Sequence, residues 1–443
     1  MDWPFESGLR DVAWPAVPAP HAAALLALLH QLEQSQWLSP QRLRELQSRQ
    51  LELLLRHAAS SVPYYRRQWG GAAAVERFTE LPLLTRRELQ ANYGELKSER
   101  VPPEHGATGE VLTSGSTGAP IRVLRTQLSQ LFWNAITLRE HLWHRRDLRG
   151  KLAAIRYGMA GAESPTWGQA TAGVVSTGPA AGLGVDVDVD AQIAWLQRQE
   201  PDYLLTYPSN AAELARTCLR TGVRLRRLRQ VRTMGEMLSP DVRLICREAW
   251  GVPIVDMYSA EEAGYIALQC PDGESYHVQA ESLLVEILDE QGRPCAPGST
   301  GRVVVTDLHN FAMPLVRYEI GDFAEAAPAC PCGRGLPVLS RVAGRVRNML
   351  VAADGKRYFP IFGTRSMPGF ELLRQHQFVQ KSLGLVEVRL VTASPLGAQQ
   401  EETLRRHLLA HFPGFEVRLV YCASIPRSPS GKFEDFVSEL PAS

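Results

Sequence analysis

The sequence predicts a mixed α/β protein: a large layered N-terminal α/β domain with a β-rich subdomain, followed by a small, mobile α+β C-terminal domain. Three observations lead to this prediction. The chain has 443 residues, more than one ordinary compact core accommodates. From about 110 to 340, short β-rich runs alternate with helical stretches, which is typical of layered α/β domains. After about 345, two β-rich runs flank a single amphipathic stretch.

Individual elements follow from local periodicity. Apolar residues recur at steps of three and four from 22 to 58, which predicts a pair of helices. Residues 283–306 contain two β-rich stretches around a loop rich in Gly and Pro, which predicts a hairpin. Near the C-terminus, VEVRLVTA and FEVRLVY predict strands on either side of a helix at 397–412. We place the boundary at the change in pattern, which gives domains of 1–346 and 347–443.

One acidic run, DVDVD at 186–190, has two readings. Its carboxylates could bind a metal ion, but the alternation with Val favours the edge of a strand. Asp190 would then be the N-cap of the helix that begins with AQIAWL. We therefore expect no metal at this run.

Composition and charge exclude several classes of protein. Hydrophobic residues make up 45% and charged residues 21% of the chain, as in ordinary globular proteins. A net charge of +1 gives no global attraction to nucleic acid or to acidic membranes. The apolar run at 22–29 is too short to span a bilayer. Seven cysteines do not make a disulfide framework in so long a chain, so we expect a cytoplasmic setting and consider the cysteines as metal ligands.

The sharpest local motif is VLTSGSTGAP at 111–120. Glycine lets the backbone approach a ligand closely, and backbone N–H groups and hydroxyls can donate to phosphate oxygens. No Lys-Ser/Thr pair follows the last glycine, so the motif is not a Walker loop. Taken alone, it could equally be an ordinary Ser- and Gly-rich hairpin turn.

Further motifs follow it along the chain: GEMLS at 235–239, DMYSAEE at 256–262, RYEIGD at 317–322, VAGRVRNML at 342–350 and RSPSGK at 427–432. With TSGSTGAP, their order and spacing resemble the adenylate-forming acid ligases, a superfamily that includes acyl-CoA synthetases, peptide-synthetase adenylation domains and luciferases. The resemblance runs from about residue 50 to the C-terminus. It is closest to the phenylacetate-CoA ligase branch.

The resemblance implies a set of nucleotide-binding residues. Hydroxyl residues of the first motif would hold the ATP phosphates, and Gly235 and Glu236 would lie by the adenine and the acyl pocket. Tyr258 would stack near the base, Asp322 would accept hydrogen bonds from the ribose hydroxyls, and Arg345 would reach the nucleotide. The whole set is Thr113, Ser114, Ser116, Thr117, Gly235, Glu236, Tyr258, Asp322 and Arg345.

The resemblance also implies two catalytic residues. Glu262 would help to hold Mg²⁺, whereas its neighbour Glu261 should point to the other side. Lys432 would bridge acyl and phosphate oxygens during adenylation, because an ammonium can stabilise charge that develops on the α-phosphate.

The chain departs from the family pattern in two places. The first motif ends in Ala-Pro-Ile instead of the usual Lys-containing sequence, as in many members of the phenylacetate branch. Arg347 and Asn348 stand where the family usually has acidic residues, at the pivot on which the C-terminal domain rotates. The second half-reaction and its acceptor are therefore less firmly predicted than adenylation.

A separate set of residues predicts a metal site: Cys270, His277, Cys330 and Cys332. Three thiolates and one imidazole are typical ligands of a structural Zn²⁺. The two halves lie far apart in the sequence, so four unrelated residues are the alternative. Some relatives in the phenylacetate-CoA ligase branch share the pattern, which favours the metal.

The resemblance implies an ATP-dependent carboxylic acid ligase that forms an acyl-adenylate, releases pyrophosphate and transfers the acyl group to a thiol. The implied substrates are an aryl or arylacetic acid, ATP and CoA, with Mg²⁺ as cofactor. Transfer to a carrier-protein thiol or to an amine is one alternative, and a non-catalytic adenylate-binding relative is another. We expect no nucleic-acid or membrane partner, and the sequence leaves a homodimer open.

Overall fold

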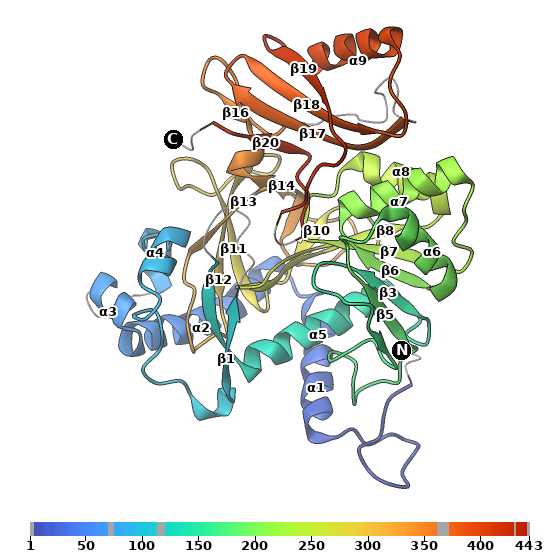
Figure 1. Cartoon of the computed structure of the whole chain (residues 1–443). Coiled ribbons are helices and arrows are strands. Elements are labelled where there is room, and N and C mark those ends of the chain that lie inside the picture. Colours follow the sequence, from blue (N-terminus) through green and yellow to red (C-terminus); the bar gives the residue numbers. More distant parts are fainter. Residues whose placement is uncertain (1–3, 70–74, 113–119, 361–371, 429–430, 441–443) are drawn as a thin grey trace. The chain divides into compact units, whose positions relative to one another are not determined.

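The computed structural model describes residues 4–69, 75–112, 120–360, 372–428 and 431–440 (Figure 1). The chain divides into two compact units, each formed by several segments. The first unit comprises Met1–Gly150, Ser164–Ala180 and Met257–Val342, and the second comprises Lys151–Glu163, Ala181–Asp256 and Ala343–Ser443. The domain boundary that we placed at 346 stays a prediction.

The helices of the first unit begin where the sequence provides caps. Ser39 accepts a hydrogen bond from the backbone N–H of Arg42, and Pro40 occupies the first turn of α2. Thr85 and Glu88 form a capping box at α4. The helices are α1 (Pro20–Ser35), α2 (Pro40–Ser61), α3 (Pro63–Trp69), α4 (Arg86–Ala91) and α5 (Gln127–Trp143), with short 3₁₀ turns η1 (Val75–Glu80) and η2 (Pro103–His105). The helical pair predicted at 22–58 corresponds to α1 and α2.

The strands of the first unit form a mainly antiparallel sheet in the order β11-β12-β13-β14-β10-β9. The hairpin predicted at 283–306 is present, because β11 and β12 pair antiparallel with Val285 opposite Val305. The strands are β9 (Gly264–Gln269), β10 (Tyr276–Val278), β11 (Leu283–Leu288), β12 (Thr300–Asp307), β13 (Tyr318–Ala327) and β14 (Val338–Arg345), and β1 (Thr108–Leu112) pairs separately with β2 (Arg122–Thr126).

The second unit contains a sheet that is covered by helices and whose central strands pair parallel. Its strands run in the order β8-β7-β6-β3-β5-β4, and apolar side chains of the helices pack on β3, β6 and β7. The strands are β3 (Leu152–Ile155), β4 (Glu163–Ser164), β5 (Ala180–Leu183), β6 (Tyr203–Thr206), β7 (Gln230–Met234) and β8 (Ile254–Ala260), and the helices are α6 (Val189–Gln199), α7 (Pro208–Thr221) and α8 (Pro240–Trp250). The chain leaves this unit for the first one within β8.

The C-terminal part of the second unit is a four-stranded sheet in the order β19-β18-β17-β20. Its elements are η3 (Val346–Asn348), β15 (Leu350–Val351), β16 (Arg357–Tyr358), β17 (Leu373–Ser382), β18 (Leu385–Thr392), α9 (Ala398–His411), β19 (Glu416–Tyr421) and β20 (Phe436–Ser438). The strand–helix–strand segment predicted from the sequence is β18, α9 and β19. Together, these elements confirm the predicted mixed α/β class with a smaller C-terminal sheet.

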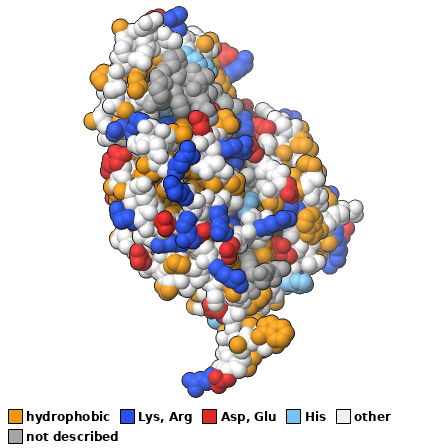
Figure 2. Space-filling model, turned by 90° about the vertical axis from the view of Figure 1, so that its right-hand side faces the viewer, with side chains coloured by type: hydrophobic (Ala, Val, Ile, Leu, Met, Phe, Trp, Pro, Cys, Tyr) orange, Lys and Arg blue, Asp and Glu red, His pale blue; other side chains and the backbone are white. Residues whose placement is uncertain are grey.

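Charged side chains of both signs lie on the face that Figure 2 presents. Figure 2 shows Lys and Arg side chains interspersed with Asp, Glu and hydrophobic side chains on the face that it presents. Within the part of the chain that the structure describes, no helix has both the length and the apolar character needed to cross a bilayer.

Two histidines, the half-buried His309 and the buried His376, should make the fold sensitive to acid. Burial lowers the pKa of His309 to about 4, and burial together with the nearby Arg216 lowers the pKa of His376 to about 3. Histidines of an unfolded chain titrate near pH ~6.5, so between that pH and the folded pKa the unfolded state binds more protons. We expect the free energy of unfolding to fall by about 1.4 kcal/mol per pH unit for each histidine as the pH drops from about 6.5 to 4.

Urea unfolding at several values between about pH 7 and 5 would measure this slope. The variant His376→Gln should flatten it by about 1.4 kcal/mol per pH unit, because the substituted side chain does not titrate. Gln31→Ala is the control, since Gln31 is an exposed residue of α1 that does not titrate, so the slope should be unchanged. An unaltered slope in His376→Gln would contradict the assignment.

Candidate active site

The residues predicted to bind the ATP phosphates, Thr113, Ser114, Ser116 and Thr117, lie outside the described residues. The strands that precede and follow them, β1 and β2, pair antiparallel from Thr108 opposite Thr126 to Leu112 opposite Arg122. The phosphate contacts of these four residues stay predictions.

In the first unit, the structure brings together two of the predicted nucleotide-binding residues. The hydroxyl of Tyr258, on β8, donates a hydrogen bond to Oδ2 of Asp322, on β13, across 2.8 Å. Tyr258 is buried and Asp322 is half-buried. Gly321 has a φ of 87°, a conformation that glycine adopts without strain, and it directly precedes Asp322. The structure thus brings these two residues together, and their base-stacking and ribose-binding roles stay predictions.

The predicted Mg²⁺ carboxylate, Glu262, lies in the turn between β8 and β9. Glu261 is exposed and Glu262 is only 6% exposed, so the adjacent side chains point to different sides, as expected. The hydroxyl of Tyr318 lies 3.5 Å from Oε1 of Glu262. A carboxylate oxygen is a suitable ligand for a hard cation such as Mg²⁺.

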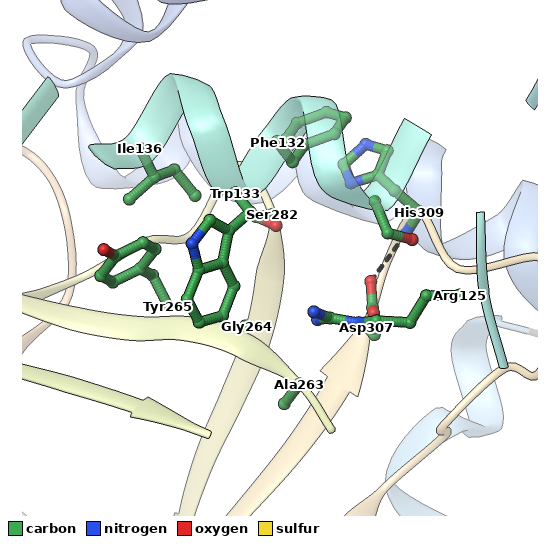
Figure 3. Close-up of a pocket in the computed structure, with 11 residues that line it drawn as sticks. Arg125, Phe132, Trp133, Ile136, Ala263, Gly264, Tyr265, Ser282, Asp307 and His309 are labelled. Carbon is green, nitrogen blue, oxygen red and sulfur yellow. Dashed lines mark hydrogen bonds between the residues drawn. The ribbon is translucent and has the colours of Figure 1, made fainter. Parts of the chain in front are cut away.

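A small pocket adjoins this turn, and sequence reasoning did not identify it (Figure 3). Arg125 and Asp307 face it together with the aromatic rings of Trp133 and Tyr265. Asp307 accepts a hydrogen bond from the backbone N–H of His309 across 3.1 Å. Burial raises the pKa of Asp307, and the guanidinium of Arg125 partly offsets this effect. The only signal in the sequence was an Asp directly after the apolar run VVVT.

In the second unit, Lys432 lies against Gly235. A Cβ added to Gly235 would be 3.3 Å from Cε of Lys432 and 3.5 Å from the ring of Tyr207. Gly235 also has a φ of 77°, which disfavours any other residue. The structure thus brings together Gly235, its neighbour Glu236 and Lys432, although almost two hundred residues separate the first two from the third.

The carboxylate of Glu236 is buried and has several hydrogen-bond donors. It accepts the backbone N–H of Ser209 across 2.9 Å and that of Phe433 across 2.6 Å. The guanidinium of Arg427 lies 3.4 Å from Oε1 of the same carboxylate. Burial raises the pKa of Glu236, and Arg427 is the largest effect that opposes the rise. Arg427 belongs to the motif RSPSGK, but sequence reasoning gave it no role.

The predicted pivot lies next to the segment that carries Lys432. Arg345 ends β14, and its backbone N–H donates to Oδ1 of Asn348 across 2.9 Å. Arg347 makes a two-pronged ion pair with Glu434, in which Nε and Nη2 lie 2.8 and 2.7 Å from the two carboxylate oxygens. The side chain of Asn348 donates to the carbonyl of Phe436 across 2.8 Å. The chain near the pivot is therefore bonded to the residues that follow Lys432.

We expect the variant Arg347→Pro to uncouple the two half-reactions of a rotating ligase. Proline fixes φ, so a residue that absorbs a backbone change between two orientations would be trapped in one of them. Acyl-adenylate formation should persist while transfer to the thiol falls, or the reverse if the other orientation is trapped. Pyrophosphate release and product thioester measure the two steps separately.

Arg347→Ala is the control for this experiment, because it removes the ion pair with Glu434 but leaves φ free. If Arg347→Pro folds and both half-reactions keep the rates of Arg347→Ala, the pivot lies elsewhere. The predicted boundary at 346 must then move.

The predicted metal ligands form a compact cluster. One potential ligand atom from each of Cys270, His277, Cys330 and Cys332 lies within 4.8 Å of all the others. Sγ of Cys270 is 3.8 Å from Sγ of Cys330, and Sγ of Cys332 is 3.3 Å from Nε2 of His277. In a tetrahedral site with Zn–S bonds of ~2.3 Å, neighbouring sulfur atoms are roughly 3.8 Å apart. The donor types and their spacing therefore fit a closed Zn²⁺ site.

The sheet explains why residues so far apart in sequence meet. Strands β9 and β10 pair antiparallel with His277 opposite Leu268, and β10 pairs with β14 through His277 opposite Val338. Cys270 follows β9, and the two other cysteines lie in the connection between β13 and β14. The ladder thus places both halves of the cluster at one end of these strands.

The comparisons with known proteins place the chain in a family. A family model described as AMP-binding enzyme matches residues 74–312. The chain therefore belongs to the AMP-binding enzyme family, the class that its motifs predicted.

Within that class, the chain is similar to phenylacetate-coenzyme A ligases. It is 27% identical to the enzyme of Thermus thermophilus over 331 residues, which cover 70% of this chain and 72% of the relative. It is 26% identical to the Escherichia coli enzyme over 424 residues, which cover 87% and 92% of the two chains. The predicted resemblance to this branch is confirmed.

A solved structure supports the fold. The structure of 2-hydroxyisobutyryl-CoA ligase in the postadenylation state, in complex with R3-HIB-AMP, matches with a TM-score of 0.70. The match covers 89% of each chain at 20% sequence identity. At this identity the likeness confirms the fold alone.

Proposed function

We propose that this protein is an ATP-dependent carboxylic acid ligase that converts an aryl or arylacetic acid into its CoA thioester through an acyl-adenylate. The observation that carries the proposal is the position of Lys432 against Gly235, because it brings together two motifs to which the resemblance assigns roles in adenylation. The similarity to phenylacetate-coenzyme A ligases supports the choice of acid and acceptor.

The proposed chemistry has two steps. A carboxylate oxygen of the acid attacks the α-phosphorus of ATP, and the bond to pyrophosphate breaks. The thiol of CoA then attacks the acyl carbonyl, loses its proton, and expels AMP. The protein forms no covalent intermediate, so its contribution is to position the reactants and to stabilise developing charge.

Several side chains would hold the nucleotide and its metal ion. Asp322 would accept the ribose hydroxyls, and Tyr258 would lie by the base while its own hydroxyl holds Asp322. Glu262 would hold Mg²⁺, which offsets the negative charge of the phosphates. Lys432 would supply a mobile positive charge to the α-phosphate oxygens. The other residues that we propose to bind the nucleotide are Thr113, Ser114, Ser116, Thr117, Gly235, Glu236 and Arg345.

We also propose that Cys270, His277, Cys330 and Cys332 hold a structural Zn²⁺. Four protein ligands close such a site and leave no position at which a water could be activated. The ion would stabilise the first unit by joining the β9–β10 hairpin to the connection before β14.

A panel of arylacetic, benzoic and aliphatic acids, assayed for pyrophosphate release and for acyl-CoA, tests the proposed function. We expect release of pyrophosphate with an aryl or arylacetic acid and formation of its CoA thioester. Pyrophosphate release without formation of the CoA thioester would indicate that the acceptor is a carrier-protein thiol or an amine instead of CoA. No release with any acid would overturn it in favour of a non-catalytic adenylate-binding protein.

A further inference from the structure

The residue that directly follows Lys432 is held by a buried carboxylate, that of Glu236. Its side chain is only 5% exposed. The backbone N–H of Phe433, the residue directly after Lys432, donates to Oε1 across 2.6 Å. The backbone N–H of Ser209, at the start of α7, donates to Oε2 across 2.9 Å. Glu236 thus joins the segment of Lys432 to a helix of the parallel-sheet layer.

Arg427 holds the same segment on its N-terminal side. Its Nη1 donates to Oγ of Ser209 across 2.8 Å and to the carbonyl oxygen of Gly431 across 3.2 Å. The same nitrogen lies 3.4 Å from Oε1 of Glu236. Arg427 therefore contacts the residue directly before Lys432, whereas Glu236 contacts the residue directly after it.

Backbone hydrogen bonds also hold the residue Lys432 itself. The N–H of Ser428 donates to the carbonyl of Lys432, and the N–H of Gly431 donates to the carbonyl of Ser428, both across 2.8 Å. A Cβ added to Gly431 would lie 2.6 Å from Cβ of Tyr157, so this glycine is in close contact with the residues after β3. These contacts fix the base of the lysine side chain and leave its outer part against Gly235.

A buried ion pair contributes little net stability, because desolvation of both charges offsets their attraction. The pair between Glu236 and Arg427 is therefore better explained by the geometry that it imposes than by the stability that it adds. A displacement of about 1 Å in a reacting group can slow a reaction roughly 10²-fold. The buried charges of Glu236 and Arg427 are therefore explained if they keep Lys432 in position.

We propose that Glu236 and Arg427 are positioning residues that fix Lys432 for acyl-adenylate formation. This inference rests on the proposed function and deepens it. It assigns to the Glu236 side chain a role through Lys432, whereas the resemblance implied only that Glu236 lies by the adenine and the acyl pocket.

A double-mutant cycle tests the inference on the full-length protein. The variants are Glu236→Gln, which keeps the shape of the side chain, Lys432→Ala, and the two combined. We expect Glu236→Gln alone to slow pyrophosphate release roughly 10²-fold at saturating ATP. In the Lys432→Ala background, the same change should alter the rate by no more than about twofold, since the group that it positions is absent. Thioester formation from supplied acyl-adenylate should persist in all three.

Two further variants complete the design. Arg427→Gln should slow pyrophosphate release as much as Glu236→Gln does. If thermal unfolding shows that one of the two variants folds poorly, the other still tests the inference. Glu439→Gln is the matched control, because it removes a C-terminal ion pair of 2.6 Å with Lys381 that does not contact this segment. We expect that control to keep the wild-type rate.

Multiplicative losses in the double mutant would overturn the inference, because Glu236 would then act independently of Lys432. A raised KM for ATP with unchanged kcat in Glu236→Gln would also overturn it and indicate direct contact with the nucleotide. A wild-type protein that releases no pyrophosphate with any acid refutes the proposed function itself. The two failures are therefore distinguishable.

Discussion

Replacement of Lys432 by Ala should slow acyl-adenylate formation by roughly two to three orders of magnitude, the usual effect of losing one preorganised group that stabilises transition-state charge. The reason is local. The outer part of the Lys432 side chain lies against Gly235, in the motif that the resemblance places by the adenine and the acyl pocket. An alanine at 432 leaves the backbone bonds of that segment in place but removes the charge.

Thioester formation from supplied acyl-adenylate should survive much better in Lys432→Ala, because Lys432 lies on the C-terminal domain, which the resemblance implies rotates between the two half-reactions. Rapid-quench measurement of acyl-adenylate, and of thioester from synthetic acyl-adenylate, separates the steps. Lys381→Ala is a suitable control, since it removes another C-terminal lysine whose partner is the surface residue Glu439. Equal losses in both steps would show that Lys432 is not the adenylation lysine.

Elements with strong local periodicity were predicted correctly. The helices α1 and α2 each bury a regular apolar stripe, so their apolar spacing identifies them. The β11–β12 hairpin was identified by the loop rich in Gly and Pro between two β-rich runs, and the β18–α9–β19 segment by its strand and helix patterns. Strand β17 was missed although it lies at the centre of the C-terminal sheet. Its buried positions include the polar residues His376, Gln377 and Gln380, so the apolar pattern that marks a strand is interrupted.

At the run DVDVD, the sequence predicted the edge of a strand where the structure has none. We read it as the edge of a strand with Asp190 as the N-cap, whereas β5 ends at Leu183 and the helix α6 begins at Val189. Asp188 is the cap, because its side chain accepts the backbone N–H of Asp190. The alternation of Val and Asp therefore marks a turn that ends in a helix cap, and Asp188 is the residue whose carboxylate caps the helix.

Contacts between residues far apart in the sequence were beyond sequence reasoning. Arg427 was quoted within a motif, but its partners Ser209 and Glu236 lie about two hundred residues earlier, and only the fold brings them together. The same holds for Arg125 and Asp307, which face one pocket from β2 and β12. Long-range pairs of this kind depend on strand order, which one sequence does not specify.

Zinc should be present in the purified protein at about one ion per chain, since one closed site has four ligands. Its loss should lower the melting temperature by roughly 5–10 °C, because metal binding is coupled to folding of the strands that carry the ligands. The variant Cys332→Ser removes one thiolate from the cluster and should reproduce the effect of a strong chelator on the wild type.

The decisive experiment applies the chelator to the wild-type protein and to Cys332→Ser and compares the two changes in melting temperature. Chelation should destabilise the wild-type protein but add little to Cys332→Ser, because both remove the same ion. Cys422→Ser is the matched control, since that half-buried cysteine lies outside the cluster in the C-terminal sheet. Its zinc content and its response to the chelator should equal those of the wild type. Protein that contains no zinc and whose melting temperature does not respond to the chelator would refute the site, and the proximity of the three thiols to His277 would then be a matter of packing alone.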